Sequence, residues 1–536
     1  MERSEIAANP EVHKEGQRRL HRVAGIHGDI VASSIGPGST VASQCSPVIA
    51  LQRLRGHDVT TPYINGQMIE VDPAAMTPVL NPASGKPFSK VFMARPEHMT
   101  RAIDAAYAVK DVWGNTLPSE RELILIRAAD VLESMRAEVV DLLIEEAGST
   151  FGKAHLEVSV VTGVFRSAAG ECRRIMGQTI PCDVPGRISM VIRRPLGVVG
   201  GIAPFNFPLI LASKKVAFAL AAGNTFVLKP SEETSLVGLK IAEIFDKAGL
   251  PPGVLNVVTG DGPTLGEALY SDPRVKAILF TGSTAVGRHI GIECARRGKK
   301  FDLEMGGKSP LLVMKDANLK YAVDTACFGM FIHQGQIGMA GSRVIVEEPV
   351  YEEFLDLFVA KVKSLKVGDP RDPDTVIGPL IRASQCPFIA GRIESSKAEG
   401  ARVLCGGTYE GNYFQPTVIA DVTPSMAVFQ EELFGPVVSV IKARDADDAI
   451  QLANNTRYGL TSAVITNDLQ LAMRCALELE SGSVHINGST VHDEPHAPFS
   501  GVKDSGMGRE GGQWSMDELT QLKWVTIQRG EARYPF

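Results

Sequence analysis

The sequence predicts an α/β protein with two doubly wound lobes, each a parallel sheet covered by helices. Three observations predict this fold class. The chain has 536 residues, which is too long for one ordinary domain. From Tyr63 onward, short apolar runs alternate with amphipathic segments, as in successive β-α-β units. A second run of the same kind extends from about Pro310 to Asn487.

The first lobe is expected to begin with two amphipathic helices, Glu97 to Trp113 and Glu120 to Ala147. Their apolar residues recur at steps of three and four, which is the helical period. Strands and helices then alternate along the chain. The expected strands are 195–204, 224–228, 254–259 and 277–280, and the expected helices are 209–222, 234–248 and 262–271.

Two stretches fit neither lobe. Residues 178–194 predict a hairpin, and residues 514–528 predict a closing helix and strand. Edge elements of this kind often pair across subunits. Residues 1 to about 60 contain SSIGPGST and show weak periodicity, so we expect a poorly ordered extension. A docking arm or targeting segment is the alternative: three arginines favour a transit peptide, and two glutamates oppose it.

Composition excludes several classes of protein. Apolar residues make up 44% and charged residues 22%, which is ordinary for a soluble globular chain. Lys and Arg number 55 against 61 Asp and Glu, so no basic field for nucleic acid is present. The most apolar stretch, 196–212, is too short for a membrane span and contains prolines. The beginning of the sequence shows no secretory signal pattern.

The eight cysteines contain no CxxC pair, so neither a zinc knuckle nor a disulfide scaffold is expected. Sparse cysteines suit a reducing, cytoplasmic compartment. Three histidines, His485, His492 and His496, lie near one another in the sequence. Their spacing does not match a metal site, and no metal is predicted.

Glycine-rich turns in the first lobe are candidates for a phosphate site. Residues 282–287 (GSTAVG) follow an apolar strand and begin a helical stretch. Backbone N–H groups at such a turn can hold a phosphate against a helix N-terminus. The alternative is a plain connection between strand and helix. Neither a GxGxxG fingerprint after the first strand nor a P-loop occurs in the sequence.

Two polar residues next to buried strands are candidates for catalysis. Asn206, in APFNFPL, lies where a strand ends, and its amide could donate to a developing oxyanion. A turn-forming Asn is the alternative. Glu304, in LEMGGKSP, follows an apolar run, where burial would raise its pKa toward that of a general base. A capping acid is the alternative.

Two further segments are polar. Residues 333–343 (HQGQIGMAGSR) predict a loop without a nucleophile before Ser342. In QEELFGPVV, Glu431, Glu432 and Phe434 could bind a ribose and stack on a ring. A solvated acidic turn is the alternative for the second segment. Each of these signals is weak alone, and their order along the chain carries the argument.

Taken together, the motifs resemble the aldehyde dehydrogenase superfamily over about residues 60 to 530. Eight blocks occur in the family's order: APFNFPL, LKPSEET, FTGSTAVG, LEMGGKSP, GQIGMAGSR, QEELFGPV, NNTRYGL and HAPFSGVKDSGMGREGG. The resemblance implies an NAD(P)-binding domain over 61–176 and 196–306 and a catalytic domain over 307–504. It also implies bridging elements over 177–195 and 505–530, which assemble homodimers or homotetramers.

The resemblance also implies a role for each matched residue. Asn206 and the backbone at 338 would form an oxyanion hole, and Glu304 would be the general base. The implied cofactor-binding residues are Ala203, Pro204, Phe205, Lys229, Ser231, Glu232, Gly262, Gly266, Phe280, Gly282, Ser283, Gly287, Glu432 and Phe434. NAD is the expected cofactor, because Glu232 would pair with free ribose hydroxyls and repel a 2′-phosphate; NADP remains possible.

One departure concerns the nucleophile. The family's cysteine lies in GQxCxxxxR, and here Gly338 occupies that position, 34 residues after Glu304. Glycine supplies no thiolate to attack the aldehyde carbon, so little or no dehydrogenase activity is expected. Either a single change has removed the nucleophile, or the chain is a natural pseudoenzyme that binds dinucleotide or aldehyde. The intact Glu304, Asn206 and Glu432 favour the single change.

The resemblance near the C-terminus is to the branch that oxidises aromatic aldehydes such as benzaldehyde, vanillin and salicylaldehyde. It is carried by INGSTVHDEPHAPFSGVKDSGMGR. Phe207, Phe331 and Phe499, with Phe205, would line an apolar mouth suited to a flat ring. Ordinary core aromatics are the alternative. An acylating enzyme of the same fold is disfavoured by Glu304, because such members often lack this base.

Overall fold

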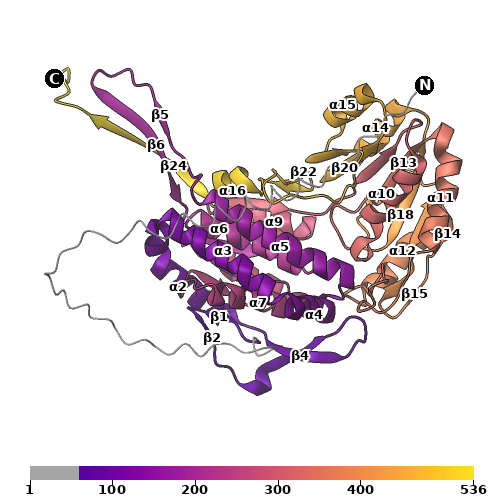
Figure 1. Cartoon of the computed structure of the whole chain (residues 1–536), viewed down its shortest axis with the longest axis horizontal. Coiled ribbons are helices and arrows are strands. Elements are labelled where there is room, and N and C mark those ends of the chain that lie inside the picture. Colours follow the sequence, from indigo (N-terminus) through magenta and orange to yellow (C-terminus); the bar gives the residue numbers. More distant parts are fainter. Residues whose placement is uncertain (1–59) are drawn as a thin grey trace, which may run out of the picture. The chain divides into compact units, whose positions relative to one another are not determined.

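The structure, a computed structural model, describes residues 60–536 (Figure 1). The expectation for the N-terminal extension lies outside this part, apart from residue 60. The described chain holds two large sheets with helices around them, and a separate three-stranded sheet. Among these residues, no helix combines the length and apolar character that a membrane span requires.

The first large sheet has eight strands in the order β2-β1-β9-β8-β7-β10-β11-β23. Its five central strands are parallel, and β1 and β23 pair antiparallel at either side. The strands are β1 (Tyr63–Ile64), β2 (Gln67–Met68), β7 (Val198–Ile202), β8 (Thr225–Lys229), β9 (Leu255–Val257), β10 (Val275–Thr281), β11 (Lys300–Glu304) and β23 (Gly506–Met507). The central strands are almost wholly buried, as parallel strands covered on both faces require.

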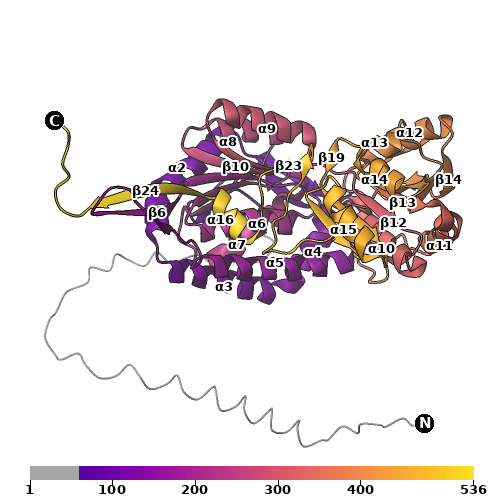
Figure 2. The same cartoon turned by 90° about the horizontal axis from the view of Figure 1, so that it is seen from above.

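Helices cover both faces of this sheet (Figure 2). One face carries α2 (Pro96–Asn115), α8 (Gly262–Ser271) and α9 (Thr284–Arg296), and the other carries α6 (Pro208–Ala221) and α7 (Ser235–Lys247). Outside α6 and α7 lie α3 (Pro118–Ser134), α4 (Arg136–Ala147) and α5 (Phe151–Glu171). Prolines in the first turn begin α2, α3 and α6, where a missing N–H is tolerated.

The single helix expected over 120–147 is wrong. The structure has two helices, α3 and α4, separated at Met135, whose φ of −100° and ψ of 8° are not helical. Neither glycine nor proline marks this break, so the periodic pattern runs through it unchanged. Helix α4 ends at Gly148, which adopts a left-handed φ of 62° that glycine tolerates without strain.

The second large sheet has seven strands in the order β14-β17-β18-β13-β12-β20-β21, parallel except at β14. The strands are β12 (Pro310–Val313), β13 (Arg343–Glu347), β14 (Arg402–Cys405), β17 (Thr417–Ala420), β18 (Val437–Ala443), β20 (Thr461–Ile465) and β21 (Ser483–Ile486). Its helices are α10 (Leu319–Phe331), α11 (Tyr351–Lys363), α12 (Gln385–Ala398), α13 (Ala427–Gln430), α14 (Ala446–Asn454) and α15 (Leu469–Glu478). These elements fall within the second expected α/β run.

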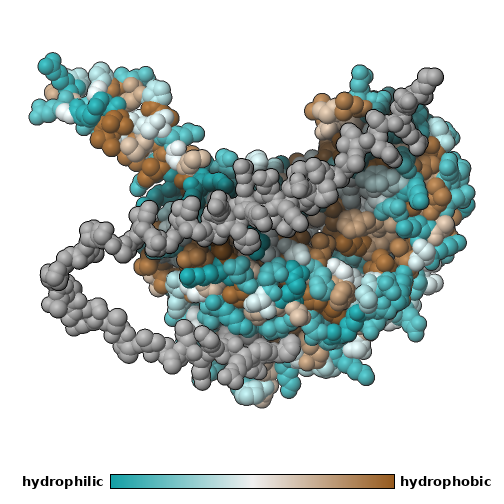
Figure 3. Space-filling view, in the orientation of Figure 1, coloured by the Kyte–Doolittle hydropathy of each residue, from teal (hydrophilic) through white to brown (hydrophobic). Residues whose placement is uncertain are grey.

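The three-stranded sheet is formed by the two stretches that fit neither lobe. Strands β5 (Gln178–Ile180) and β6 (Arg187–Pro195) make the expected hairpin, and β24 (Thr520–Gln528) pairs along the whole of β6. Helix α16 (Gly512–Glu518) leads into β24. Apolar residues gather on this sheet and around α15 (Figure 3). On β24, Leu522 and Trp524 are 64% and 68% exposed.

Candidate active site

Two pockets meet between the carboxyl end of the first sheet and the loop that precedes β13. We call them the glycine-turn pocket, of about 240 Å³, and the apolar pocket, of about 340 Å³. Four residues line both: Asn206, Thr281, Met305 and Gly338. Glu304 lines the apolar pocket, and Glu432 lines the glycine-turn pocket. The fold therefore brings Asn206, Glu304 and Gly338 to one junction, although they come from three separate sequence blocks.

Asn206 lies in the turn between β7 and α6. A buried carboxylate from α5, Glu157, accepts hydrogen bonds from the N–H groups of Leu209 (2.9 Å) and Ile210 (3.1 Å) and so fixes the start of α6. The Asn206 side chain is 6% exposed, and its Nδ2 donates to the carbonyl oxygen of Gln336 at 2.9 Å. The amide has a second N–H, which leaves a donor for an oxygen in the pocket.

Glu304 ends β11 and is 3% exposed. Within residues 60–536, neither carboxylate oxygen has a hydrogen-bond partner. Burial, together with the nearby carboxylates of Asp302 and Glu510, raises the pKa of Glu304 well above its usual value. A buried carboxyl with free oxygens and a raised pKa is suited to take a proton from water.

The loop between α10 and β13, which carries position 338, begins with a strained backbone. His333 and Gln334 have left-handed φ values of 51° and 56°, which non-glycine residues rarely adopt. The Gln334 amide donates to the carbonyl oxygens of Gly148 (3.2 Å) and Pro379 (2.9 Å). The Gln336 side chain accepts from the N–H of Ile381 at 3.1 Å. These bonds offset the strain and position the loop before any ligand binds.

The backbone conformation at position 338 does not require a glycine. Its φ lies outside the left-handed range, so an L-residue fits its conformation. A Cβ atom there would lie 3.2 Å from Leu460 Cδ2 and 3.6 Å from the carbonyl oxygen of Met305. The closer neighbour is the end of a flexible side chain that can move by a few tenths of an ångström. Position 338 therefore has room for a side chain.

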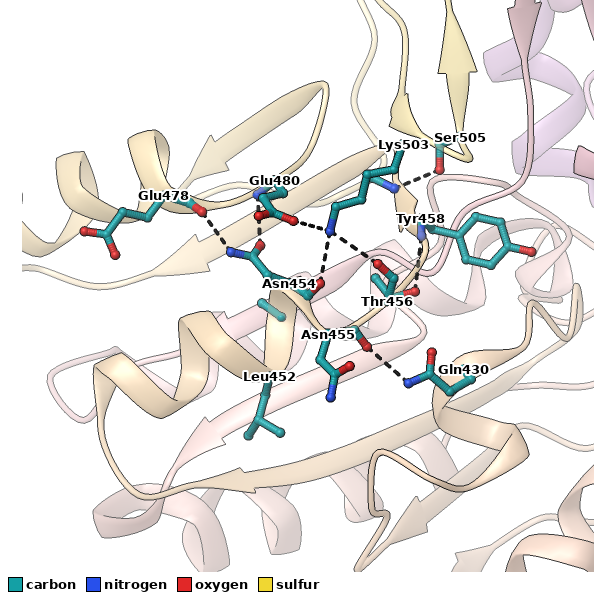
Figure 4. A network of polar contacts seen from close by, with 12 residues as sticks. Gln430, Leu452, Asn454, Asn455, Thr456, Tyr458, Glu478, Glu480, Lys503 and Ser505 are labelled. Atoms are coloured by element: carbon teal, nitrogen blue, oxygen red, sulfur yellow. Dashed lines mark hydrogen bonds and ion pairs between the residues drawn. The ribbon is translucent and has the colours of Figure 1, made fainter.

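A polar network joins the NNTRYGL block, which ends at Leu460, to the last block (Figure 4). Lys503 donates to the carbonyl oxygen of Asn454 at 3.0 Å and pairs with Glu480. The N–H of Gly459 donates to Ser505 Oγ at 2.9 Å, and the carbonyl oxygen of Ser505 accepts from Met305 at 2.8 Å. Both blocks thus support the wall of the junction, and Leu460 and Phe499 line the apolar pocket directly.

Around the glycine-turn pocket, side chains pack directly against the backbone of glycines. A Cβ on Gly287 would lie 2.5 Å from Met305 Sδ, and a Cβ on Gly306 would lie 2.5 Å from Glu432 Oε2. Glu432 Oε1 accepts from the N–H of Gly307 at 2.9 Å. Burial raises the pKa of Glu432 to about 7. Phe434, with a left-handed φ of 51°, packs edge-to-face on Phe205 with ring centroids 5.7 Å apart.

A second group of predicted cofactor residues lies at the ends of β8 and α8. Lys229 Nζ donates to Glu232 Oε2 at 2.9 Å, and a Cβ on Gly262 would lie 3.6 Å from Lys229 Nζ. The Lys229 ammonium helps to lower the pKa of Glu232 below its usual value, although burial opposes it. Arg382 lies 3.9 Å from the other Glu232 oxygen. A carboxylate held in its charged form is thus available here.

The remaining predicted cofactor residues are placed as follows. Pro204, Phe205, Gly282 and Ser283 line the glycine-turn pocket together with Glu432 and Phe434. Ser283 caps the start of α9. Gly266 lies on α8, where a Cβ would be 3.8 Å from Ile202 Cδ1. Ala203, Ser231 and Phe280 are buried and line neither pocket.

The apolar pocket contains two of the three phenylalanines predicted for it. Phe207 and Phe499 line the pocket, but Phe331 does not. The expectation for Phe331 is corrected: it is fully buried in the core of the second lobe and packs near Phe358, with ring centroids 6.4 Å apart. Phe328, one helical turn earlier on α10, is 49% exposed and lines the pocket instead.

Several residues of the site were not identified from the sequence. The pockets include Thr281, Met305, Gln336, Arg382 and Lys214. Gln336 and Met305 fall inside motif blocks, so their position next to predicted site residues in the sequence could have identified them. Arg382 and Lys214 fall in segments that look like ordinary polar helix or loop positions, and only the folded chain shows their place.

Comparison with known proteins identifies the family of the chain. Residues 70–525 match the model of the "Aldehyde dehydrogenase family". The chain is 41% identical to a benzaldehyde dehydrogenase of Bacillus subtilis over 475 residues, covering 88% of this chain and 98% of that protein. It is 41% identical to a vanillin dehydrogenase of Corynebacterium glutamicum over 478 residues, covering 88% and 99%. A salicylaldehyde dehydrogenase of Pseudomonas putida G7, solved with salicylaldehyde, superposes with a TM-score of 0.87 at 37% identity, covering 89% and 99%.

Proposed function

Because the chain belongs to the aldehyde dehydrogenase family, we propose that its two pockets form the active site of an NAD(P)-dependent dehydrogenase of aromatic aldehydes. In this site Gly338 occupies the position of the nucleophile, and the chain itself has little or no dehydrogenase activity. The observation that carries the proposal is the junction where Asn206, Glu304 and Gly338 line one pocket.

With a cysteine at 338, each residue of the junction would have a defined task. The thiolate attacks the aldehyde carbon, and the resulting oxyanion accepts hydrogen bonds from Asn206 Nδ2 and the N–H of residue 338. A dinucleotide held in the glycine-turn pocket would accept the hydride that the adduct must lose to become a thioester. Glu304 then takes a proton from the water that hydrolyses the thioester, and the acid leaves. Without sulfur at 338, the first bond in this sequence does not form.

The residues around the glycine-turn pocket fit a dinucleotide. Glu432, held by the N–H of Gly307, is placed to accept from ribose hydroxyls, and Gly282 and Ser283, which line the same pocket at the start of α9, are placed to contact a pyrophosphate. We propose NAD as the preferred cofactor. The charged Glu232, next to Lys229, would accept from free adenosine ribose hydroxyls and disfavour a 2′-phosphate. The ammonium of Lys229 leaves NADP possible.

We propose an aromatic aldehyde as substrate because of the wall of the apolar pocket. Phe207, Phe328 and Phe499 line it, and its volume of about 340 Å³ suits a single ring with small substituents. The relatives named above act on benzaldehyde, vanillin and salicylaldehyde by their names. A clear preference of the cysteine-restored protein for an aliphatic aldehyde such as hexanal would overturn this part.

Assembly and compartment are also proposals. The three-stranded sheet with its exposed Leu522 and Trp524 would join a second copy in a homodimer or homotetramer. The seven described cysteines are all free, which suits a reducing cytoplasm. Sedimentation of the purified chain tests the first point: a monomer at all concentrations would contradict it.

A second candidate function is a natural pseudoenzyme that binds dinucleotide or aldehyde without turnover. Gly338 is the observation that favours it. Substitution of Gly338 by cysteine separates the two candidates, because position 338 has room for the side chain. NAD-dependent oxidation of an aromatic aldehyde by the Gly338→Cys protein supports the dehydrogenase. A folded Gly338→Cys protein that oxidises no aldehyde supports the non-catalytic binding protein.

A further inference from the structure

A partly buried ion pair lies in the wall of the apolar pocket and has no task in the proposed chemistry. Lys214 on α6 is 2% exposed, and its Nζ lies 2.8 Å and 3.1 Å from the two carboxylate oxygens of Asp493. The ammonium also lies over the ring of Phe499, 5.0 Å from its centroid. Lys214, Asp493 and Phe499 all line the pocket that Glu304 and Gly338 line.

This pair is unusual because most of the pocket wall is apolar. The surrounding side chains include Leu156, Val160, Ile210, Leu211, Phe328 and Val491. Burying an ammonium in such a place is unfavourable unless it is paired, and a well-packed apolar pair of the same size would often be at least as stable. Here the carboxylates of Asp493 and Glu510 outweigh the effect of burial and hold the pKa of Lys214 above its usual value. The ammonium is therefore charged where a ring substituent would lie.

We propose that Lys214 and Asp493 form a subsite for a hydroxyl group on the ring of the aldehyde, so that the preferred substrates are hydroxylated aromatic aldehydes. The inference rests on the proposed function. An ammonium has three N–H donors, and Asp493 occupies at most two of them. A ring hydroxyl can accept from the remaining N–H of Lys214 and donate to a lone pair of Asp493. An ion pair offers the hydroxyl both a donor and an acceptor, whereas a lone cation offers only a donor and a lone carboxylate offers only an acceptor.

Charge argues for a hydroxyl and against a carboxylate on the ring. Asp493 already balances the ammonium of Lys214, and the neighbouring Lys215 is paired with Glu510. A substrate anion would therefore meet no uncompensated positive charge, and it would be repelled by Asp493 and Glu510, which line the same pocket. A neutral hydroxyl interacts with the pair without breaking it.

The unaltered chain makes a direct test possible, because without a thiol at 338 it holds an aldehyde without forming the thioester. Dissociation constants are measured by isothermal titration calorimetry for benzaldehyde, the three monohydroxybenzaldehydes and 4-carboxybenzaldehyde. At least one hydroxy isomer is expected to bind about tenfold or more tightly than benzaldehyde, the gain of a charge-assisted hydrogen bond. The carboxy compound is expected to bind no better than benzaldehyde.

The test is completed by two variants. Lys214→Met keeps the length of the side chain, and Lys214→Met with Asp493→Asn removes both charges so that no unpaired charge remains. Both are expected to bring the dissociation constant of the hydroxy isomer within about twofold of that of benzaldehyde for the same variant. An unchanged preference in the double variant, tighter binding of the carboxy compound, or no binding of any hydroxy isomer would overturn the subsite.

Failure of the proposed function gives a different result. In the Gly338→Cys protein, kcat/KM for the favoured hydroxy isomer over benzaldehyde is expected to fall about tenfold with Lys214→Met. If Gly338→Cys oxidises no aldehyde, the dehydrogenase proposal fails and the binding preference still decides the subsite. If it oxidises all isomers with the same ratio before and after Lys214→Met, the subsite fails and the dehydrogenase proposal stands.

Discussion

Asn206 Nδ2 donates a hydrogen bond of 2.9 Å to the carbonyl oxygen of Gln336, two residues before Gly338. This bond ties the turn after β7 in the first lobe to the loop before β13 in the second. The same amide that would meet an oxyanion also positions the loop on which the nucleophile would stand. Position 338 and its oxyanion donor are thus held as one unit.

Removal of this amide is expected to slow the chemistry of the cysteine-restored protein. In the Gly338→Cys background, Asn206→Ala should lower kcat by about 10²–10³-fold, because one oxyanion donor is lost. Stopped-flow NADH absorbance measures the change. Titration with NAD, followed by melting temperature, serves as the control and should show unchanged affinity. An unchanged kcat would exclude Asn206 from the oxyanion hole.

Loss of the carboxylate at 304 is expected to separate hydride transfer from hydrolysis. With Gly338→Cys, Glu304→Gln should give a burst of about one NADH per active site and then a steady rate lower by about 10²–10⁴-fold. The reason is that only the water attack needs a base. The exposed Glu399 offers a control: Glu399→Gln should leave both phases unchanged. Loss of the burst itself would contradict the assignment.

The raised pKa of Glu304 predicts a dependence on pH as well. A general base must be ionised, so hydrolysis in the Gly338→Cys protein should become faster as the pH rises through the raised pKa. The folded state favours the neutral carboxyl, whose contribution to stability is lost as the pH rises above the unfolded value. Glu304→Gln should therefore raise the melting temperature more at pH 8 than at pH 5.

Cofactor preference is expected to depend on Glu232. Glu232→Gln keeps the size of the side chain but removes the negative charge beside Lys229. The ratio of NADP to NAD affinity should rise by about tenfold, since the repulsion of a 2′-phosphate is lost. Thermal-shift titration of the unaltered and variant chains with both dinucleotides measures the ratio. Equal ratios for the two chains would show that Glu232 lies outside the ribose site.

The strained loop before position 338 predicts an unequal response of two glycines to alanine. Gly335 has a φ of +70°, and a Cβ there would lie 2.3 Å from the carbonyl oxygen of Gly435. Gly335→Ala should destabilise the fold by about 2–3 kcal/mol. Gly391, within α12, has no atom within 4 Å of its Cβ position, so Gly391→Ala should be neutral or stabilising by about 0.5–1 kcal/mol. Differential scanning calorimetry compares them.

Much of the fold follows from local patterns in the sequence. The strands predicted after Pro195 and before Phe280 are recovered because buried parallel strands are short apolar runs with glycine or polar residues at their ends. The hairpin over 178–194 is also recovered, although its two strands are antiparallel and mostly exposed or half-buried. The break at Met135 is not, since nothing in the sequence distinguishes it from the helical stretches on either side.

Some site residues that are far apart in the sequence and meet only in the folded chain could not be predicted from the sequence. Lys214 looks like one of two adjacent lysines on a helix, and its partner Asp493 lies 279 residues further along the chain. Phe331 and Phe328 are both apolar residues on α10, and only packing decides that one enters the core and the other lines the pocket. The left-handed φ of Gln334 is accompanied by hydrogen bonds from its side chain to the distant carbonyl groups of Gly148 and Pro379.

The most direct measurement is NADH formation from an aromatic aldehyde by three proteins: the unaltered chain, Gly338→Ala and Gly338→Cys. The site is otherwise assembled, and position 338 accepts a side chain. Gly338→Cys is therefore expected to exceed both other proteins by at least about 10³-fold, the scale on which a missing nucleophile acts. A folded Gly338→Cys protein that stays at the level of Gly338→Ala, or an unaltered chain that turns over as fast as Gly338→Cys, would contradict the account.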